Sequence, residues 1–203
     1  AEAYANAHLG ILKSNDSREN SFEVDAVTVN PFLGTDSVLP FIKLARKNGK
    51  GVFILVKTSN PSSKEIQDRK CNNKTIYQIV ANQVNKLGKD LIDKSGYSPI
   101  GAVVASTNPK ITNNLRSIMP NTYFLVPGFG AQRASLKNIA KCFNPNGYGA
   151  IVNSSRGITY AYNLSPWKEK YGTKHWECAV EEAVIKMNKD LKEVTGKTRK
   201  KKS

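Results

Sequence analysis

The chain has 203 residues, which is enough for one domain with a hydrophobic core of its own. Apolar residues make up 39% of it, and no apolar run approaches the ~20 residues that a membrane-spanning helix needs. These values predict a soluble globular protein without a membrane partner. Lysine and arginine outnumber aspartate and glutamate by 31 to 16, and the net charge of +15 favours anionic ligands.

Three cysteines, Cys71, Cys142 and Cys178, lie far apart in the sequence. Because no Cys-x-x-Cys pair occurs, they predict neither a disulfide framework nor a thiolate zinc site. A reducing, cytoplasmic location is therefore expected. The segment HWEC (175–178) holds further metal-ligand types, but residues two apart on a helix point in different directions, so we predict no metal site there.

The first predicted elements are a helix, a strand and a second helix. The opening residues AEAYANAHL are typical of a helix interior, and Gly10 marks its end. A nearly continuous apolar run over residues 24–30 predicts a strand. Residues 36–50 follow as a helix, with Asp36 as its cap and Gly49 as its stop.

The rest of the chain repeats this alternation. Further strands are predicted over residues 51–58, 100–107, 121–128 and 148–155, and further helices over 74–96, 109–120, 134–143 and 165–194. Most of the strands are continuously apolar, which is typical of strands covered on both faces. Five strand–helix units therefore predict a parallel sheet of the α/β class. Six apolar residues of the helix 74–96 are expected to face the core: Ile76, Ile79, Val80, Val84, Leu87 and Leu91.

Small, polar or turn-forming residues follow each predicted strand. In a βα barrel the carboxyl ends of the strands form the active site, and the loops after the last two strands commonly bind phosphate. Here the last two exits are PGFG (127–130) and NSSRG (153–157). Their backbone N–H groups, hydroxyls and guanidinium suit a phosphate dianion, so the sequence predicts a phosphate site at these exits.

Three motifs, VFILVKTSNPSS, YFLVPGFGAQ and IVNSSRGI, occur in this order along the chain. Together they resemble the orotidine 5′-monophosphate decarboxylase family in its divergent bacterial and protozoan form. The resemblance runs from the first residue to about the end of the last predicted helix. It implies a (βα)8 TIM barrel of the ribulose-phosphate-binding type, with residues 1–194 as about its last five units. Residues 195–203 are then expected to form a basic, disordered tail.

The resemblance also implies a reaction. The family removes the C6 carboxylate of orotidylate to give UMP and carbon dioxide, in pyrimidine nucleotide synthesis, and works as a homodimer without a metal or organic cofactor. Its Asp-x-Lys-x-x-Asp array stabilises and protonates the carbanion at C6. No such array occurs among these 203 residues, and the resemblance places it just upstream of Ala1. We therefore expect no catalytic residue in this chain, which would be a decarboxylase portion that is inactive alone.

Phosphate-binding residues follow from the motifs that match. Gln132, at the end of PGFGAQ, is expected to contact the phosphate from a loop. Arg156, in NSSRG, is expected to bind it through the guanidinium, and the N–H of Ser155 is expected to join that contact.

The pyrimidine-binding residue is expected in the motif VKTSN. Either Thr58 or Ser59 supplies the hydroxyl that holds the pyrimidine edge, and the choice between them stays open. Asn30 and Gly128 also end predicted strands, and both are candidate residues of the site mouth.

Two other classes of function stay open. Another phosphate-binding βα-barrel enzyme, such as a sugar-phosphate lyase or an isomerase, would share these strand exits, although VKTSN argues against it. A non-catalytic remnant that binds nucleotides or nucleic acid through its basic surface is the second class. Steeply salt-dependent DNA binding without UMP affinity would favour it. Because the lysines are scattered among helices rather than interleaved with aromatic residues, nucleic acid is the less expected partner.

Overall fold

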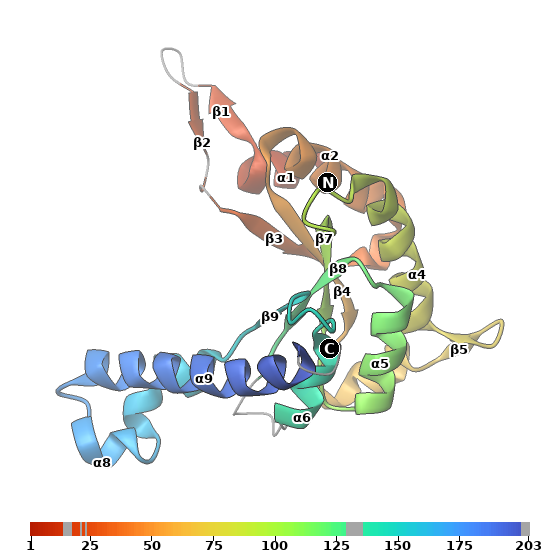
Figure 1. Ribbon diagram of the computed structural model, residues 1–203. Coiled ribbons are helices and arrows are strands. Elements are labelled where there is room, and N and C mark those ends of the chain that lie inside the picture. The colour runs from red at the N-terminus through yellow and green to blue at the C-terminus, as the bar shows by residue number, and fades with distance from the viewer. Residues whose placement is uncertain (14–17, 21, 23, 129–135, 200–203) are drawn as a thin grey trace. The chain divides into compact units, whose positions relative to one another are not determined.

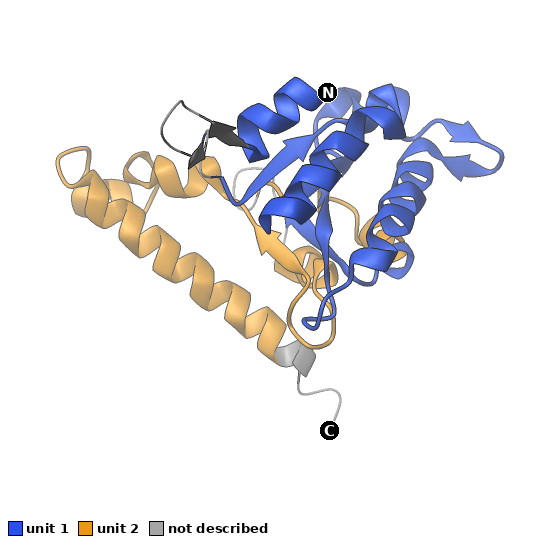
Figure 2. Ribbon diagram, turned by 90° about the horizontal axis from the view of Figure 1, so that it is seen from above, with its two compact units in different colours: residues 1–104, 117–125 blue, residues 105–116, 126–203 orange. Residues whose placement is uncertain are grey.

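The computed structural model describes the whole chain except residues 14–17, 21, 23, 129–135 and 200–203. It divides into two compact units, which Figure 2 shows in different colours. Unit 1 holds residues 1–104 and 117–125, and unit 2 holds residues 105–116 and 126–203. Among the described helices, none is long and apolar enough to cross a membrane.

Unit 1 contains four parallel strands in the order in which they occur along the chain. They are β3 (Ala26–Val29), β4 (Gly51–Lys57), β7 (Ser98–Val104) and β8 (Thr122–Val126), of which the last residue belongs to unit 2. Each falls within or close to a predicted strand. The register places Ile54 of β4 beside Ala102 of β7, and Ala102 beside Phe124 of β8, all three almost fully buried. Only β7 is buried at nearly every residue, as its continuous apolar run predicts, whereas β4 and β8 alternate buried with half-buried residues.

The helices of unit 1 are α1 (Glu2–Leu9), α2 (Thr35–Asn48), α3 (Lys64–Gln67) and α4 (Ile76–Gly88) (Figure 1). Ala1 is the N-cap of α1, and its carbonyl oxygen accepts from the N–H of Ala5 (2.9 Å). Gly10 caps the other end of α1 as predicted, and a Cβ there would lie 2.4 Å from the carbonyl oxygen of Asn6. The opening residues therefore form the predicted helix.

The C-terminal end of α2 agrees with the prediction, and its N-terminal end does not. Gly49 ends α2 as predicted, with a left-handed φ of 66°. The predicted cap Asp36 is wrong: Gly34 occupies the N-cap position, and Asp36 lies in the first turn. With φ at 97°, Gly34 makes the sharp turn that lets the helix begin at Thr35, one residue earlier than predicted.

Helix α4 buries a different face from the predicted one. Its buried residues are Tyr77, Ala81, Val84 and Gly88, of which only Val84 was expected. A Cβ at Gly88 would lie 2.7 Å from the hydroxyl of Ser98 in β7, so the small residues of α4 let the helix approach the sheet closely. The helix also ends at Gly88 and is followed by the short turn η3 (Lys89–Leu91), rather than continuing to residue 96.

Two short hairpins in unit 1 were not predicted. One joins β1 (Ile11–Lys13) to β2 (Arg18–Asn20), and the other joins β5 (Lys70–Cys71) to β6 (Lys74–Thr75). The turn of the second hairpin consists of Asn72 and Asn73, which both have positive φ. Asparagine tolerates this conformation, and a two-residue turn of this kind suits the twist of a hairpin.

Unit 2 holds the last strand, β9 (Ala150–Val152), inside the predicted range 148–155. The N–H of Asn153 donates to the carbonyl oxygen of Val126 (2.9 Å), and its own carbonyl oxygen accepts from the N–H of Gly128 (3.1 Å). Asn153 thus bonds to Val126 and Gly128, the residues before and after the one opposite it, which is the hydrogen-bond pattern of parallel strands. The sheet order is thus β3-β4-β7-β8-β9, and the prediction of five parallel strands is confirmed.

The helical elements of unit 2 begin with α5 (Pro109–Ile118), whose last two residues belong to unit 1, and α6 (Leu136–Ile139). They continue with α7 (Ser155–Thr159), α8 (Trp167–Tyr171) and α9 (Trp176–Arg199). The helical region predicted over 165–194 consists of two helices, because Gly172, with φ at 54°, ends α8 and separates it from α9. Helix α9 continues to Arg199, so the predicted start of a disordered tail at residue 195 falls inside a helix.

Candidate functional site

The exit of β9 leads directly into α7 in unit 2. Ser154 is buried at the N-cap position, and Ser155 and Arg156 are exposed in the first turn. The first hydrogen bond of the helix runs from the N–H of Ile158 to the carbonyl oxygen of Ser154 (3.1 Å). The N–H groups of residues 155–157 consequently have no acceptor inside the helix, and they are available to a ligand or to water.

The guanidinium of Arg156 forms no ion pair and no side-chain hydrogen bond with any residue that the structure describes. Ser155 is nearly as free, since its hydroxyl only accepts a long hydrogen bond (3.4 Å) from the side chain of Asn153. A positive side chain next to unpaired N–H groups is a suitable arrangement for an anion.

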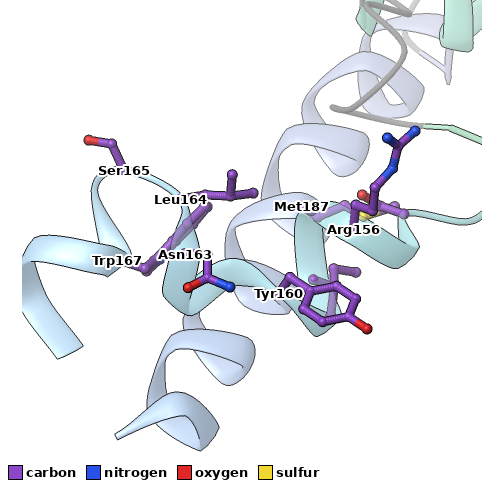
Figure 3. Close-up of a pocket in the computed structure, with 10 residues that line it drawn as sticks. Arg156, Tyr160, Asn163, Leu164, Ser165, Trp167 and Met187 are labelled. Carbon is purple, nitrogen blue, oxygen red and sulfur yellow. The ribbon is translucent and has the colours of Figure 1, made fainter. Parts of the chain in front are cut away.

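Arg156 also lines a pocket of about 670 Å³ formed by residues of unit 2 alone. Figure 3 shows Arg156 and Met187 at one end of this pocket and Ser165 and Trp167 towards the other, with Tyr160 between them. The lining is mostly aromatic and aliphatic, so the arginine is its main source of charge.

Two further predicted residues, Gly128 and Gln132, follow β8 in the sequence. Gly128 has a φ of 85°, a conformation that favours glycine, and its N–H is the one bonded to Asn153. The structure thus brings Gly128 next to the strand exit that carries Ser155 and Arg156. Gln132 lies outside the described residues.

The exit of β4, in unit 1, contains a β-bulge. Leu55 pairs with Val103 of β7, but the next paired residue of β4 is Lys57, opposite Val104. The bulge breaks the alternation of the strand, so Val56 and Lys57 are both buried. The Nζ of Lys57 lies 2.8 Å from the Oδ1 of Asp68 and 5.7 Å from the centre of the Tyr77 ring. This buried ion pair anchors the chain immediately before the predicted pyrimidine contact.

Thr58 and Ser59 differ sharply in their hydrogen bonds. The N–H of Thr58 donates to the Oε1 of Gln67 (3.0 Å), and its hydroxyl accepts from the Nε2 of Gln67 (2.7 Å). The same hydroxyl donates to the Oδ1 of Asn60 (2.6 Å). Ser59, by contrast, makes no hydrogen bond to the described part of the chain, through either its hydroxyl or its N–H. The N–H and hydroxyl of Thr58 are therefore already hydrogen-bonded within the chain, whereas those of Ser59 have no partner among the described residues and can bind a ligand.

Asn30 follows β3, the strand next to β4. The Oδ1 of Asn30 accepts from the N–H of Phe32 (3.0 Å) and so caps the short turn η1 (Pro31–Leu33). Asn30 also lines a pocket of about 360 Å³ together with Ala1, Tyr4 and His8. Its side-chain oxygen is therefore structural, and its exposed amide nitrogen is the group left for a ligand.

The expected Asp-x-Lys-x-x-Asp array has no counterpart in the site. Ala1 itself contributes only a methyl group and backbone to the pocket beside Asn30, and it offers no side chain for acid–base chemistry. Among the described residues, no group of three or more histidine, cysteine, aspartate or glutamate side chains could hold a metal ion.

The predicted residues fall into two groups, one in each unit. Asn30, Thr58 and Ser59 belong to unit 1, where they follow neighbouring strands. Gly128, Ser155 and Arg156 belong to unit 2. Sequence reasoning missed Gln67, Asn60 and Asp68, which hold the exit of β4 through side-chain hydrogen bonds and an ion pair. The sequence does show polar residues after the strand β4. It does not show which residues they bond to, because those partners depend on how the chain folds back.

Parallel strands joined by helices place the chain in the α/β class, and their sequential order with polar residues at the exits is the pattern found in βα barrels. Within that class, the chain belongs to the orotidine 5′-phosphate decarboxylase / HUMPS family, whose sequence model matches residues 13–169. The family resemblance found in the sequence motifs is thereby confirmed.

Individual relatives agree with this assignment. The chain is 44% identical over 192 residues to the orotidine 5′-phosphate decarboxylase of Rhodopirellula baltica, which is 95% of this chain and 63% of that protein. It is 44% identical over 162 residues to the enzyme of Caldicellulosiruptor bescii, which is 80% of this chain and 53% of that protein. The chain therefore spans between half and two thirds of the length of these relatives.

Solved structures support the fold class. The structure resembles the UMP synthase of Leishmania donovani with a TM-score of 0.67 and 27% identity, over 96% of this chain and 36% of that one. It resembles the OMP decarboxylase of the same organism with a TM-score of 0.64 and 26% identity, over 94% of this chain and 62% of that one. The predicted α/β class and the partial βα barrel are confirmed.

Proposed function

We propose that this chain supplies the pyrimidine- and phosphate-binding residues of an orotidine 5′-phosphate decarboxylase, which converts orotidine 5′-phosphate to UMP and carbon dioxide. The observation that carries the proposal is the family membership together with the polar residues at the exits of β4 and β9. Relatives that share 38–44% identity with the chain have that name.

The phosphate is assigned to the exit of β9. Arg156 provides a guanidinium that is unpaired among the described residues, and the N–H groups of residues 155–157 provide donors without an acceptor inside α7. Gln132 is proposed as a further phosphate ligand on the motif alone. A dianion held in this way does not react, and its binding energy serves to position the pyrimidine.

The pyrimidine edge is assigned to Ser59 rather than Thr58. Binding through the Thr58 hydroxyl would first break a hydrogen bond to Asn60 or Gln67, whereas the hydroxyl and N–H of Ser59 are unoccupied by described residues. Forming a new hydrogen bond without losing an existing one gives the larger net gain. Asn30 and Gly128 are proposed as flanking residues of the site mouth.

The decarboxylation itself needs a group that stabilises and protonates the carbanion at C6. The resemblance to the decarboxylase family assigns this role to an Asp-x-Lys-x-x-Asp array. That pattern does not occur among the 203 residues. We therefore expect the 203 residues alone to bind UMP but not to release carbon dioxide from orotidine 5′-phosphate. We also propose that the complete enzyme works as a homodimer in the cytoplasm, without a cofactor.

Titration of the chain with UMP tests the proposal, with Arg156→Ala as the decisive variant. Loss of a charge-assisted contact on an exposed guanidinium is worth about 2 kcal/mol, so we expect roughly 30-fold weaker binding. Arg46→Ala is the matched control, since it removes the same charge from an exposed position on α2. Equal losses in the two variants would show that UMP binds only through the net charge, and would contradict the proposed site.

A further inference from the structure

The side chain of Gln67 bonds to both polar groups of Thr58 at once. Its Oε1 accepts the N–H of Thr58, and its Nε2 donates to the hydroxyl of the same residue (3.0 and 2.7 Å). The backbone N–H can only donate, so it fixes which end of the Gln67 amide is the oxygen. The amide nitrogen must then face the hydroxyl, and the hydroxyl proton is directed to Asn60. The backbone N–H of Thr58 thus determines the orientation of the Gln67 amide, of the Thr58 hydroxyl and of its bond to Asn60.

This network lies on either side of Ser59 in the sequence. Thr58 precedes Ser59 and Asn60 follows it, and the hydrogen bond from Thr58 to Asn60 (2.6 Å) joins the two neighbours. Both ends of the short segment 58–60 are thus held, while Ser59 itself is free of hydrogen bonds to described residues. Such a segment presents its middle side chain in a fixed direction.

A second contact holds the same segment from the strand side. Asp68, the neighbour of Gln67, forms the ion pair with Lys57, the neighbour of Thr58. Two consecutive residues at the end of α3 therefore hold two consecutive residues at the end of β4. Because one contact is an ion pair and the other a pair of neutral hydrogen bonds, their effects can be separated by substitution.

We propose that Gln67 is a positioning residue for the pyrimidine, which acts through Thr58 to hold Ser59 in the orientation that the base requires. The inference rests on the proposed function of Ser59. A hydroxyl bond to a base edge depends steeply on distance and angle, so the free energy that Ser59 contributes depends on how well its backbone is held. Gln67 touches neither base nor phosphate in this arrangement.

The experiment compares the affinities of the chain for UMP and for ribose 5-phosphate, which lacks the base. The ratio of the two measures the contribution of the base alone. Gln67→Leu keeps an uncharged side chain of comparable size and cannot form either hydrogen bond. We expect it to lower the affinity for UMP roughly tenfold, about the effect of one hydrogen bond, and to leave the affinity for ribose 5-phosphate unchanged. Ser59→Ala is expected to give the same result.

A double variant distinguishes positioning from general destabilisation. If Gln67 acts through Ser59, adding Gln67→Leu to Ser59→Ala weakens UMP binding no further, because the contact to be positioned is already gone. Gln78→Leu is the matched control: it makes the same substitution in unit 1 and removes the hydrogen bonds of Gln78 to Thr75 at the capping box of α4, while the bonds of Gln67 to Thr58 remain. It is expected to lower the melting temperature without changing the UMP to ribose 5-phosphate ratio.

Each other outcome overturns a stated part of the argument. If wild-type chain prefers UMP and Gln67→Leu retains the preference, the positioning role is wrong and the proposed function stands. Additive losses in the double variant would likewise contradict positioning through Ser59. If wild-type chain binds ribose 5-phosphate as tightly as UMP, the proposed base contact fails, and the inference about Gln67 fails with it.

Discussion

Breaking the ion pair between Lys57 and Asp68 should destabilise unit 1 measurably. The Lys57 side chain is only 8% exposed and that of Asp68 is 34% exposed. At their separation of 2.8 Å, two charges in an effective dielectric of about 20 attract one another by about 6 kcal/mol before the cost of dehydration. Removing one partner of a fully buried pair costs about 3–5 kcal/mol. Because water reaches Asp68, we expect Asp68→Ala to lower the free energy of unfolding by about 2 kcal/mol.

The uncompensated lysine should account for most of that loss. Lys57→Met keeps an unbranched apolar stem in the same space and removes the charge, so the double variant Lys57→Met/Asp68→Ala leaves no buried ammonium. We expect the double variant to be more stable than Asp68→Ala alone, because a buried ion pair can be replaced by apolar packing at little cost. Urea unfolding followed by circular dichroism gives the free energies for the double-mutant cycle.

An exposed aspartate of the same unit provides the control for this cycle. Asp90→Ala, in the turn η3, removes the same charge from an open position and should leave the urea midpoint unchanged. An unchanged midpoint for Asp68→Ala, or a double variant whose loss equals the sum of the single losses, would refute this account of the ion pair.

Three further predictions concern unit 2 and the surface. Arg116→Ala should lower the free energy of unfolding by about 2–4 kcal/mol in a urea titration, because one guanidinium nitrogen donates to the carbonyl oxygens of both Cys142 and Gly149 (2.6 and 2.7 Å). Burial raises the pKa of the Cys142 thiol to about 12, so mass spectrometry after brief alkylation near neutral pH should show the two exposed cysteines modified and Cys142 intact. Hydrogen bonds from Lys170 and Tyr171 lower the pKa of the half-buried Glu182 carboxyl. The resulting stabilisation is present above the usual glutamate range and is lost as pH falls through the lowered pKa, so the difference in urea midpoint between wild type and Glu182→Gln should shrink in acid.

The strands were predictable because a continuous apolar run can be recognised from adjacent residues of the chain. The run GVFILVKT has an unbroken apolar stretch, glycine included, before its lysine and threonine, and it becomes β4. The glycine stop of α2 is equally local, since a left-handed residue strongly favours glycine. Features of this kind depend on residues that are adjacent in the chain, and the sequence contains all of them.

Other features depend on contacts that no local pattern contains. The strands of the hairpin β5–β6 have two residues each, too few to show a period. The buried face of α4 is set by the close approach of Gly88 to Ser98, which lies on a strand. In the same way, Gln67 reaches Thr58 only because the chain folds back through η2 (Pro61–Ser63) and α3. The motif therefore identified the pair Thr58 and Ser59, but it could not choose between them.

The residues proposed for the pyrimidine and those proposed for the phosphate differ in how firmly they are held, and the difference follows from their chemistry. A guanidinium attracts a phosphate dianion over several ångströms, so we expect Arg156, which forms no ion pair with a described residue, to make the proposed phosphate contact from a short helix without further support. A neutral hydroxyl interacts only within a narrow range of distance and angle, so Ser59 needs neighbours that are fixed. The bulge, the ion pair and the Gln67 amide all fix that one strand exit. Substitutions near α7 should consequently change the affinity for every phosphate ester alike, whereas substitutions behind Ser59 should change which base is preferred.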